Sequence, residues 1–332
     1  MSDAPLLEVR DLSKSFVVER GFLGAPRKEL HALNSVSFTM AEGETLGIVG
    51  ESGCGKTTLG RMILRLLEPS GGRILFQGKD ITGLSQRELR PYRRAIQAVF
   101  QDPFSSLNPR MNVRAIIGEP LENFGASRAD IRRRVGELME VVGLRPDMMD
   151  RLPHAFSGGQ RQRIGIARAL ALNPKLIVCD EAVSALDVSI QAQILNLLAD
   201  IQKEFGLSLL FISHNLGVIR HVSHRIGVMY LGQMVELASE RELFEAPQHP
   251  YSRALIASVP EPDQRGNRRE RPLQGELPSP MNPPPGCTFH TRCPLAVARC
   301  RTEVPEPLEI KGGGMARCHF PGLLNHSQLE SA

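Results

Sequence analysis

The chain has 332 residues, of which 42% are hydrophobic, and its formal net charge is +4. This length allows two domains, or one large domain with an appendage, and the hydrophobic residues are numerous enough to bury a substantial core. The modest charge is spread along the sequence and lacks the dense basic stripe of a dedicated nucleic-acid binder. We expect arginine runs such as residues 132–134 to lie on solvated helix faces.

No stretch approaches the roughly 18 uninterrupted apolar residues that a membrane helix needs. The N-terminal sequence MSDAPLLEVRDLSKSF lacks the basic and apolar regions of a signal peptide. We therefore expect the protein to stay in the cytoplasm unless it docks on something in the membrane. Most of its six cysteines should be reduced there.

The first third of the chain is predicted to mix strands and helices. Residues 6–18 and 31–49 are rich in β-branched and apolar residues and predict strands, with a Gly- and Pro-containing loop over 21–30 between them. The elements that follow are a helix over 56–67, a strand over 73–81 and a short helix over 85–92.

The middle of the chain is predicted to be mostly helical from residue 103 to about 152, with an amphipathic pattern over 129–142. The elements that follow are a helix from 157 to 172, a strand over 176–180, a helix over 188–205, a strand over 208–213 and a strand pair over 226–237. Strands alternating with helices indicate an α/β domain with a parallel sheet, into which the central helical block is inserted.

The composition changes after residue 258. Eight prolines fall within residues 260–286, which predicts an extended linker rather than core. The stretch from Cys287 onward is too short to fold on hydrophobic burial alone. We therefore divide the chain into residues 1–258 and a C-terminal region, residues 259–332.

A phosphate-binding loop is predicted after the apolar strand TLGIV, where GESGCGKT fits the pattern GxxxxGK[ST] and opens a helix. Glycines let successive N–H groups turn toward an anion, and the helix N-terminus adds its positive end. Lys56 can reach the β- and γ-phosphates, Thr57 can ligate Mg²⁺, and Cys54 should face away. The residues predicted to hold ATP or GTP are Gly50, Glu51, Ser52, Gly53, Cys54, Gly55, Lys56, Thr57 and Thr58.

Two acids end the predicted buried strand LIVCD: Asp180 at its last position and Glu181 just after it. Asp180 is placed to hold Mg²⁺ through water, and Glu181 to activate the attacking water as general base. The alternative is that the two acids only cap the next helix.

A second anion-binding helix start is predicted at SGGQRQ, where Ser157 can cap a helix that begins with a glycine pair. A single P-loop does not need a second phosphate cradle in the same fold. The segment resembles the signature motif of ABC ATPases, and that family's other motifs are present in order over about residues 6–245. Ala182 and Asn215 depart from the family's usual proline and aspartate, without removing a group that the chemistry needs.

The resemblance implies roles for further residues. Phe16 would stack on adenine, Gln101 would contact Mg²⁺ and couple to membrane subunits, Asp187 would belong to the D-loop, and His214 would contact the γ-phosphate and act in catalysis with Glu181 and Lys56. It implies a P-loop NTPase fold with a RecA-like core, an ABC β-subdomain and an inserted helical subdomain over about 103–156, onto which membrane partners dock. Two such domains would pair head to tail, each ATP lying between one P-loop and Ser157, Gly158, Gly159 and Gln160 of the other.

Four cysteines lie close together near the C-terminus, at Cys287, Cys293, Cys300 and Cys318. Zinc sites usually show paired C-x₂₋₄-C knuckles, which are absent here. Disulfides are disfavoured in a reducing compartment, four unrelated thiols are an alternative, and the spacing leaves room for an iron–sulfur cluster.

A closer resemblance covers nearly the whole chain. HPYSRALIASVPEPD, GELPSPMNPPPGC and the four cysteines look like the C-terminal region of ATPase subunits from bacterial dipeptide and oligopeptide importers, which implies a [4Fe–4S] cluster at these cysteines. It also implies a place at the cytoplasmic face of the inner membrane, with a second, related ATPase, two transmembrane permeases and a substrate-binding protein as partners. Related systems carry nickel, glutathione or other small solutes. ABC ATPases that act on nucleic acid or ribosomes generally have two fused ATPase domains or a coiled-coil insertion, so we expect no nucleic-acid partner.

Overall fold

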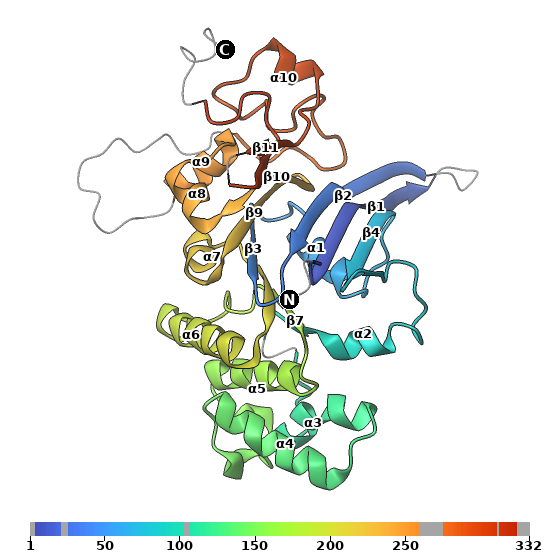
Figure 1. The fold of residues 1–332 in the computed structure, drawn as a ribbon, viewed down its shortest axis with the longest axis vertical. Helices are drawn as coiled ribbons and strands as arrows, with labels where there is room; N and C mark the ends of the chain where they lie inside the picture. Colours follow the sequence, from blue (N-terminus) through green and yellow to red (C-terminus); the bar gives the residue numbers. More distant parts are fainter. Residues whose placement is uncertain (1–3, 21–25, 103–105, 259–274, 311, 324–332) are drawn as a thin grey trace, which may run out of the picture. The chain divides into compact units, whose positions relative to one another are not determined.

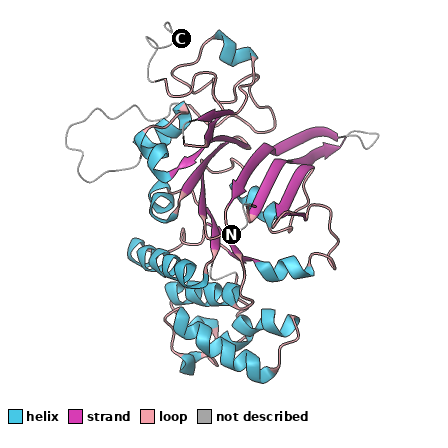
Figure 2. Ribbon diagram, viewed as in Figure 1, coloured by secondary structure: helices cyan, strands magenta, loops and turns pink. Residues whose placement is uncertain are grey.

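The computed structural model describes residues 4–20, 26–102, 106–258, 275–310 and 312–323, so most of the predicted linker, residues 259–274, lies outside the described residues. The chain forms two compact units, both containing helices and strands (Figures 1 and 2). The first unit comprises Met1–Leu6, Ala41–Thr45 and Gly83–Ile212, and the second comprises Leu7–Met40, Leu46–Thr82 and Ser213–Ala332. Within the described ranges, we find no helix of the length and apolarity needed to cross a bilayer.

The first unit contains three parallel strands, β8 (Ser208–Ile212), β7 (Leu176–Asp180) and β6 (Ile96–Val99), in that order. All residues of β7 and β8 are buried, as their continuous apolar runs predict for strands covered on both faces. The sequence predicted these two strands but missed β6, which is short and directly follows a helix. The predicted helix α6 (Val188–Phe205) is confirmed at both ends.

The predicted helical block is confirmed in the described residues. Helices α3 (Val113–Asn123) and α4 (Arg128–Val141) form the block, and the separately predicted helix α5 (Gly158–Leu170) packs against both (Figure 1). Each begins at a polar residue, Asn112, Ser127 or Ser157, whose side chain accepts a hydrogen bond from the first turn. Two short 3₁₀ helices, Pro146–Met148 and Pro153–Ala155, lie between α4 and α5. Residues 103–105, at the start of the block, lie outside the described part.

The short helix expected over 85–92 was wrongly placed, because α2 spans Arg90–Ala95. Ser85 and Glu88 instead form a turn just before α2, in which the Glu88 carboxylate accepts from both the N–H and the hydroxyl of Ser85. Pro91 has no N–H to continue hydrogen bonding from that turn and is tolerated only in the first turn of a helix. The regular helix therefore begins at the residue before this proline.

One sheet of the second unit is antiparallel, in the order β2 (Pro26–Met40), β1 (Leu7–Arg20), β4 (Gly71–Phe76) and β5 (Lys79–Asp80). The loop expected up to residue 30 is wrong for residues 26–30, which extend β2 as it pairs with β1. The single strand expected over 73–81 is two strands, separated by a tight turn with positive φ at Gln77 and Gly78.

A second sheet of this unit leads to the P-loop. Strand β3 (Thr45–Val49) runs parallel to β9 (Arg225–Tyr230), which forms the predicted hairpin with β10 (Gln233–Ser239). The predicted strand segment 31–49 is thus interrupted, since a turn separates β2 from β3. Strands β12 (Gly314–Ala316) and β11 (Leu308–Ile310) extend the sheet beyond β10. The helices of this unit are α1 (Lys56–Ile63), α7 (Leu216–Val222), α8 (Glu240–Glu245), α9 (Pro250–Ala257) and α10 (Ala298–Thr302).

Aromatic side chains attach the C-terminal region to this sheet. Phe289 is 1% exposed, and its ring centroid lies 5.2 Å from that of Tyr230 on β9 and 5.5 Å from that of Tyr251 on α9. The buried carboxylate of Glu236 on β10 accepts from the backbone N–H groups of Gln248 and His249 at 2.7 and 2.8 Å, which secures the start of α9. The stretch after Cys287 therefore gains its core from residues elsewhere in the second unit.

Candidate functional site

The P-loop joins β3 to α1 within the second unit. Its glycines adopt positive φ angles, +157° at Gly50, +82° at Gly53 and +103° at Gly55. A Cβ on Gly50 would lie 2.2 Å from the carbonyl oxygen of Met229, and one on Gly55 would lie 2.4 Å from that of Ala32. Helix α1 begins at Lys56 without a side-chain cap. This arrangement suits an anion that accepts from the N–H groups of the helix start.

Lys56 is buried within this loop. Its Nζ donates to the carbonyl oxygens of Gly50 at 2.7 Å and Glu51 at 3.0 Å. Cys54 is also buried, with Sγ 3.8 Å from the Lys56 Nζ, and burial raises the pKa of its thiol. The Cys54 side chain therefore faces the interior of the loop, next to the positively charged ammonium group of Lys56.

The two predicted acids lie at the end of β7 in the first unit. Asp180 is buried at the last position of the strand. Glu181 has a φ of +52°, and its N–H donates to the carbonyl oxygen of Ile212, the last residue of β8, at 2.9 Å. A non-glycine residue in the left-handed region is strained, and such strain is concentrated at functional sites. The geometry fixes Glu181 at the carboxyl edge of the parallel strands.

The glycine-rich start of α5 has the predicted Ser157 cap. Gln160 donates its N–H to Ser157 Oγ at 3.3 Å, and its side-chain oxygen accepts from the Ser157 N–H at 3.0 Å. The two residues thus form a capping box. A Cβ on Gly159 would lie 2.7 Å from Cγ2 of Ile190 on α6. Ser157 is exposed, so its hydroxyl can reach a ligand outside this unit.

Two further predicted residues lie in the first unit. Asp187 is exposed and precedes α6 as its N-cap residue in extended conformation. Gln101 is exposed just after β6. Both therefore follow the carboxyl end of a parallel strand, as Glu181 does.

The predicted switch histidine lies in the second unit. His214 is exposed, between Ser213, whose N–H donates to the Ile48 carbonyl oxygen at 3.1 Å, and Asn215. Asn215 caps α7 by accepting from the N–H of Gly217 at 2.9 Å, so the asparagine in place of aspartate serves as a helix cap. The hydrogen bond from Ser213 to Ile48 places His214 next to the end of β3, the strand that leads to the P-loop.

Phe16 lies on β1, half-buried, with the ammonium nitrogen of Lys14 5.2 Å from its ring centroid. The second unit therefore carries the P-loop, Phe16 and His214. The first unit carries Gln101, Asp180, Glu181, Ser157, Gly158, Gly159, Gln160 and Asp187.

One set of P-loop contacts was not predicted from the sequence. The carboxylate of Glu51 forms an ion pair with Arg292, with O–N distances of 2.6 and 3.0 Å, and the Glu51 N–H donates to the hydroxyl of Tyr251 at 3.0 Å. These partners are 241 and 200 residues away in sequence. No local pattern links such positions, so only the fold reveals them.

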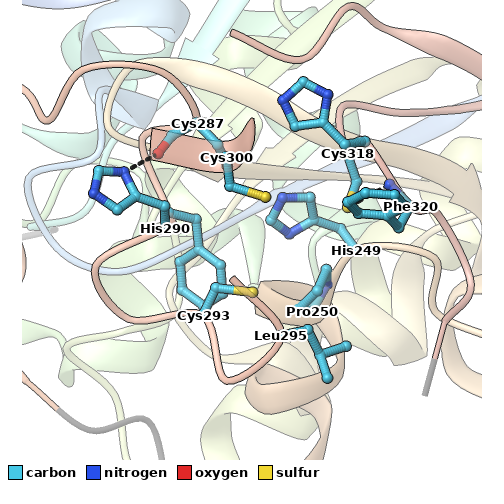
Figure 3. A pocket seen from close by; sticks show the side chains of 11 residues that line it. His249, Pro250, Cys287, His290, Cys293, Leu295, Cys300, Cys318 and Phe320 are labelled. Atoms are coloured by element: carbon cyan, nitrogen blue, oxygen red, sulfur yellow. Dashed lines mark hydrogen bonds between the residues drawn. The ribbon is translucent and has the colours of Figure 1, made fainter. Parts of the chain in front are cut away.

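The four C-terminal cysteines line one small cavity of about 20 Å³ in the second unit (Figure 3). This volume holds about one water molecule. The other lining residues include His249 of the α9 cap, Phe289 and His290. Within the described parts of the chain, no three His, Cys, Asp or Glu side chains are arranged to hold a single metal ion.

The thiols of this cavity are held in a partly buried environment. Burial raises the pKa of Cys293 to about 12 and that of Cys318 to about 11, and it also raises the pKa of Cys287. The Cys318 sulfur accepts from the N–H of Phe320 at 3.4 Å, and the N–H of Cys287 donates to the carbonyl oxygen of Cys300 at 2.9 Å. Four sulfurs with no carboxylate among the lining residues are a donor set suited to soft metals.

Comparison with protein families gives two matches. Residues 33–184 match the family described as ABC transporter, and residues 235–300 match the one described as oligopeptide/dipeptide transporter, C-terminal region. The second match includes three of the four cysteines and ends before Cys318.

Individual relatives match over nearly the whole chain. A probable peptide ABC transporter ATP-binding protein, y4tS, of Sinorhizobium fredii is 55% identical over 96% of this chain and 90% of its own length. The oligopeptide transport ATP-binding protein AppF of Bacillus subtilis is 54% identical over 95% of this chain and 97% of its own. Among solved structures, the dimeric post-hydrolysis state of the ATP-binding cassette MJ0796 with ADP and Pi has a TM-score of 0.63 and 29% identity, covering 71% of this chain and 99% of that one.

Proposed function

The chain belongs to the family of ABC transporter ATP-binding proteins, and we propose that it hydrolyses ATP to drive the import of peptides across a bacterial inner membrane. The observation that carries the proposal is the combination of a P-loop, a strained acid beyond β7 and a Ser-capped glycine helix start in a chain whose residues 235–300 match the peptide-transporter C-terminal region. The first three features suit an ATP-driven motor. The fourth supports peptide as the class of cargo.

ATP would be bound by charge and by N–H groups. The P-loop amides and the Lys56 ammonium face the anionic phosphates, and Phe16 offers a ring for the adenine. Glu181 accepts a proton from the attacking water, and His214 hydrogen-bonds the γ-phosphate. Mg²⁺, when bound through Thr57, Asp180 and Gln101, would neutralise charge on the phosphates.

A second ATPase subunit would complete each nucleotide site. Ser157 and the glycines of α5 form an anion-binding helix start that is separate from the P-loop and exposed in part. In a head-to-tail pair, each ATP would contact the P-loop of one subunit and Ser157–Gln160 of the other, with Asp187 near the contact. The related cassette MJ0796 is a dimer in its post-hydrolysis state, which supports pairing of two such chains. Hydrolysis removes the γ-phosphate and weakens the interface, which opens the pair.

The partners would be those of a peptide importer: a second, related ATPase, two transmembrane permeases and a substrate-binding protein. Helices α3 and α4 form the block that follows Gln101, and they would dock on the permeases. The chain would then lie at the cytoplasmic face of the inner membrane as a peripheral subunit.

The cysteine cavity would hold a [4Fe–4S] cluster. Its four thiols are the usual ligands of such clusters, and no carboxylate competes with them. Because the cavity has room for about one water molecule, it would have to widen on binding.

Reconstitution tests the proposal. The chain is co-expressed with its permeases and second ATPase, purified from membranes and placed in liposomes with the binding protein. We expect ATP-dependent uptake of labelled di- or oligopeptides that stops with Glu181→Gln. Uptake of nickel or glutathione but not of peptides would refute the proposal that peptides are the cargo. Failure of the chain to co-purify with membrane proteins would refute the transporter role.

A further inference from the structure

Glu51 places a carboxylate in a loop that binds phosphates, and this negative charge repels an anionic ligand. In this fold the carboxylate is neutralised by Arg292, which contacts both of its oxygens, at 2.6 and 3.0 Å. The Arg292 side chain is only 5% exposed and that of Glu51 30%, so solvent screens the pair little. Two parallel N–H···O bonds also fix the orientation of the carboxylate.

The backbone at the same residue has a second contact. The hydroxyl of Tyr251, on α9, accepts the Glu51 N–H at 3.0 Å, and Tyr251 is fully buried. That N–H belongs to the second residue of the P-loop. The contact therefore fixes the direction of the loop backbone where it leaves β3.

Arg292 is itself rigidly supported. Its guanidinium carbon lies 5.9 Å from the ring centroid of Tyr230, on β9, and its backbone N–H donates to the carbonyl oxygen of Phe289 at 3.0 Å. Phe289 in turn packs on Tyr230 and Tyr251. The same aromatic cluster thus supports both groups that contact Glu51.

We infer that Arg292 and Tyr251 are positioning residues of the nucleotide site, through which the C-terminal region holds the P-loop in its phosphate-binding conformation and cancels the charge of Glu51. The inference rests on the proposed role of the P-loop. It means that the C-terminal region contributes to ATP binding at the P-loop of its own chain.

The test measures ATP affinity by equilibrium titration of the full chain with a fluorescent ATP analogue. Arg292→Met keeps much of the side-chain volume but leaves the Glu51 charge uncompensated, and we expect the Kd to rise about tenfold. In the double variant Glu51→Gln, Arg292→Met the uncompensated charge is gone, so the Kd should return to within about threefold of the wild-type value. Tyr251→Phe loses one hydrogen bond and should weaken binding by about two- to fivefold.

The steady-state kinetics separate positioning from chemistry. The Arg292→Met effect should fall on KM, with little change in kcat, because Glu181 is untouched. Arg241→Ala, which removes an exposed ion pair with Glu245 in the same unit, serves as the control and should change neither value. Circular dichroism verifies that each variant is folded.

Two results would overturn the inference. One is wild-type ATP affinity in folded Arg292→Met and Tyr251→Phe proteins. The other is a double variant that binds ATP as weakly as Arg292→Met alone, since the charge of Glu51 would then be irrelevant. Failure of the wild-type chain to bind the analogue at all would instead refute the proposed function.

Discussion

The N–H of Glu181 donates to the carbonyl oxygen of Ile212 at 2.9 Å, which attaches the first residue beyond β7 to the end of β8. The φ of +52° at Glu181 is maintained by this bond and by the Ser184 hydroxyl, which donates to the Glu181 carbonyl oxygen at 3.0 Å. A strained backbone held from both sides fixes where the side chain starts. This rigidity is what a general base requires.

Replacing Glu181 by glutamine should abolish turnover while keeping nucleotide binding. The amide preserves the size of the side chain but cannot accept a proton, so kcat should fall about 10²- to 10⁴-fold. Steady-state ATPase assays and equilibrium titration measure the two quantities. Glu140→Gln, on the exposed side of α4, is the control. Turnover near the wild-type rate would remove Glu181 from the role of base.

Replacing Lys56 by alanine should weaken ATP binding by about 10- to 100-fold, since a charge-assisted hydrogen bond to the phosphates is lost. Titration with ATP measures the change. Lys79→Ala, at an exposed position of β5 in the same unit, should bind as the wild type does. Unchanged affinity in the Lys56 variant would contradict the phosphate assignment.

Replacing Gly159 by alanine should disturb the start of α5. The new methyl group would lie 2.7 Å from Cγ2 of Ile190, so either α5 or α6 must shift, at a cost of about 1–3 kcal/mol in the free energy of unfolding. ATP-dependent pairing of a Glu181→Gln chain with the second ATPase subunit, followed by sedimentation, should weaken as well. Adding Ile190→Ala creates space and should restore part of both losses; a Gly159→Ala chain with unchanged stability and dimerisation would refute the packing argument.

Replacing Phe289 by alanine should lower the free energy of unfolding by about 3–5 kcal/mol, because the ring is buried between Tyr230 and Tyr251. Urea denaturation measures the loss. Met281→Ala, at a side chain that is 46% exposed, is the control. A Phe289 variant as stable as the control would mean that this aromatic cluster does not hold the C-terminal region.

Anaerobically purified protein should contain about four iron and four sulfide per chain if the cysteine cavity holds the proposed cluster. Cys293→Ser should lose most of both, because a hydroxyl is a poor ligand for this iron. Elemental analysis and visible absorption measure the content. Zinc in place of iron would refute the cluster and keep a metal site.

The sequence predicted the parts of this fold that local pattern encodes. Helix α6 is a long periodic run, and strands β7 and β8 are continuous apolar runs. The P-loop and the Ser157 cap are short motifs with their own geometry. It misplaced the start of α2, because the turn at Ser85 that precedes this helix uses the same residue types that cap helices. It missed β6, which is too short to show a period.

The contacts that support the P-loop could not be predicted from local sequence patterns. Glu51, Tyr251 and Arg292 are far apart in sequence and meet only because β9, α9 and the C-terminal segment share the aromatic cluster. Nothing in the neighbouring residues of Glu51 distinguishes a paired carboxylate from a solvated one. The contacts become visible only once the fold is known.

The central claim is that this chain supplies half of each of two nucleotide sites and that a facing subunit supplies the rest. The most direct test is the ATPase rate per chain measured as the second, related ATPase subunit is added over a range of concentrations, with sedimentation reporting the oligomer present. We predict that the rate per chain rises as pairs form and is lost when Ser157–Gln160 is deleted. A full rate from monomers that lack this segment would contradict the account.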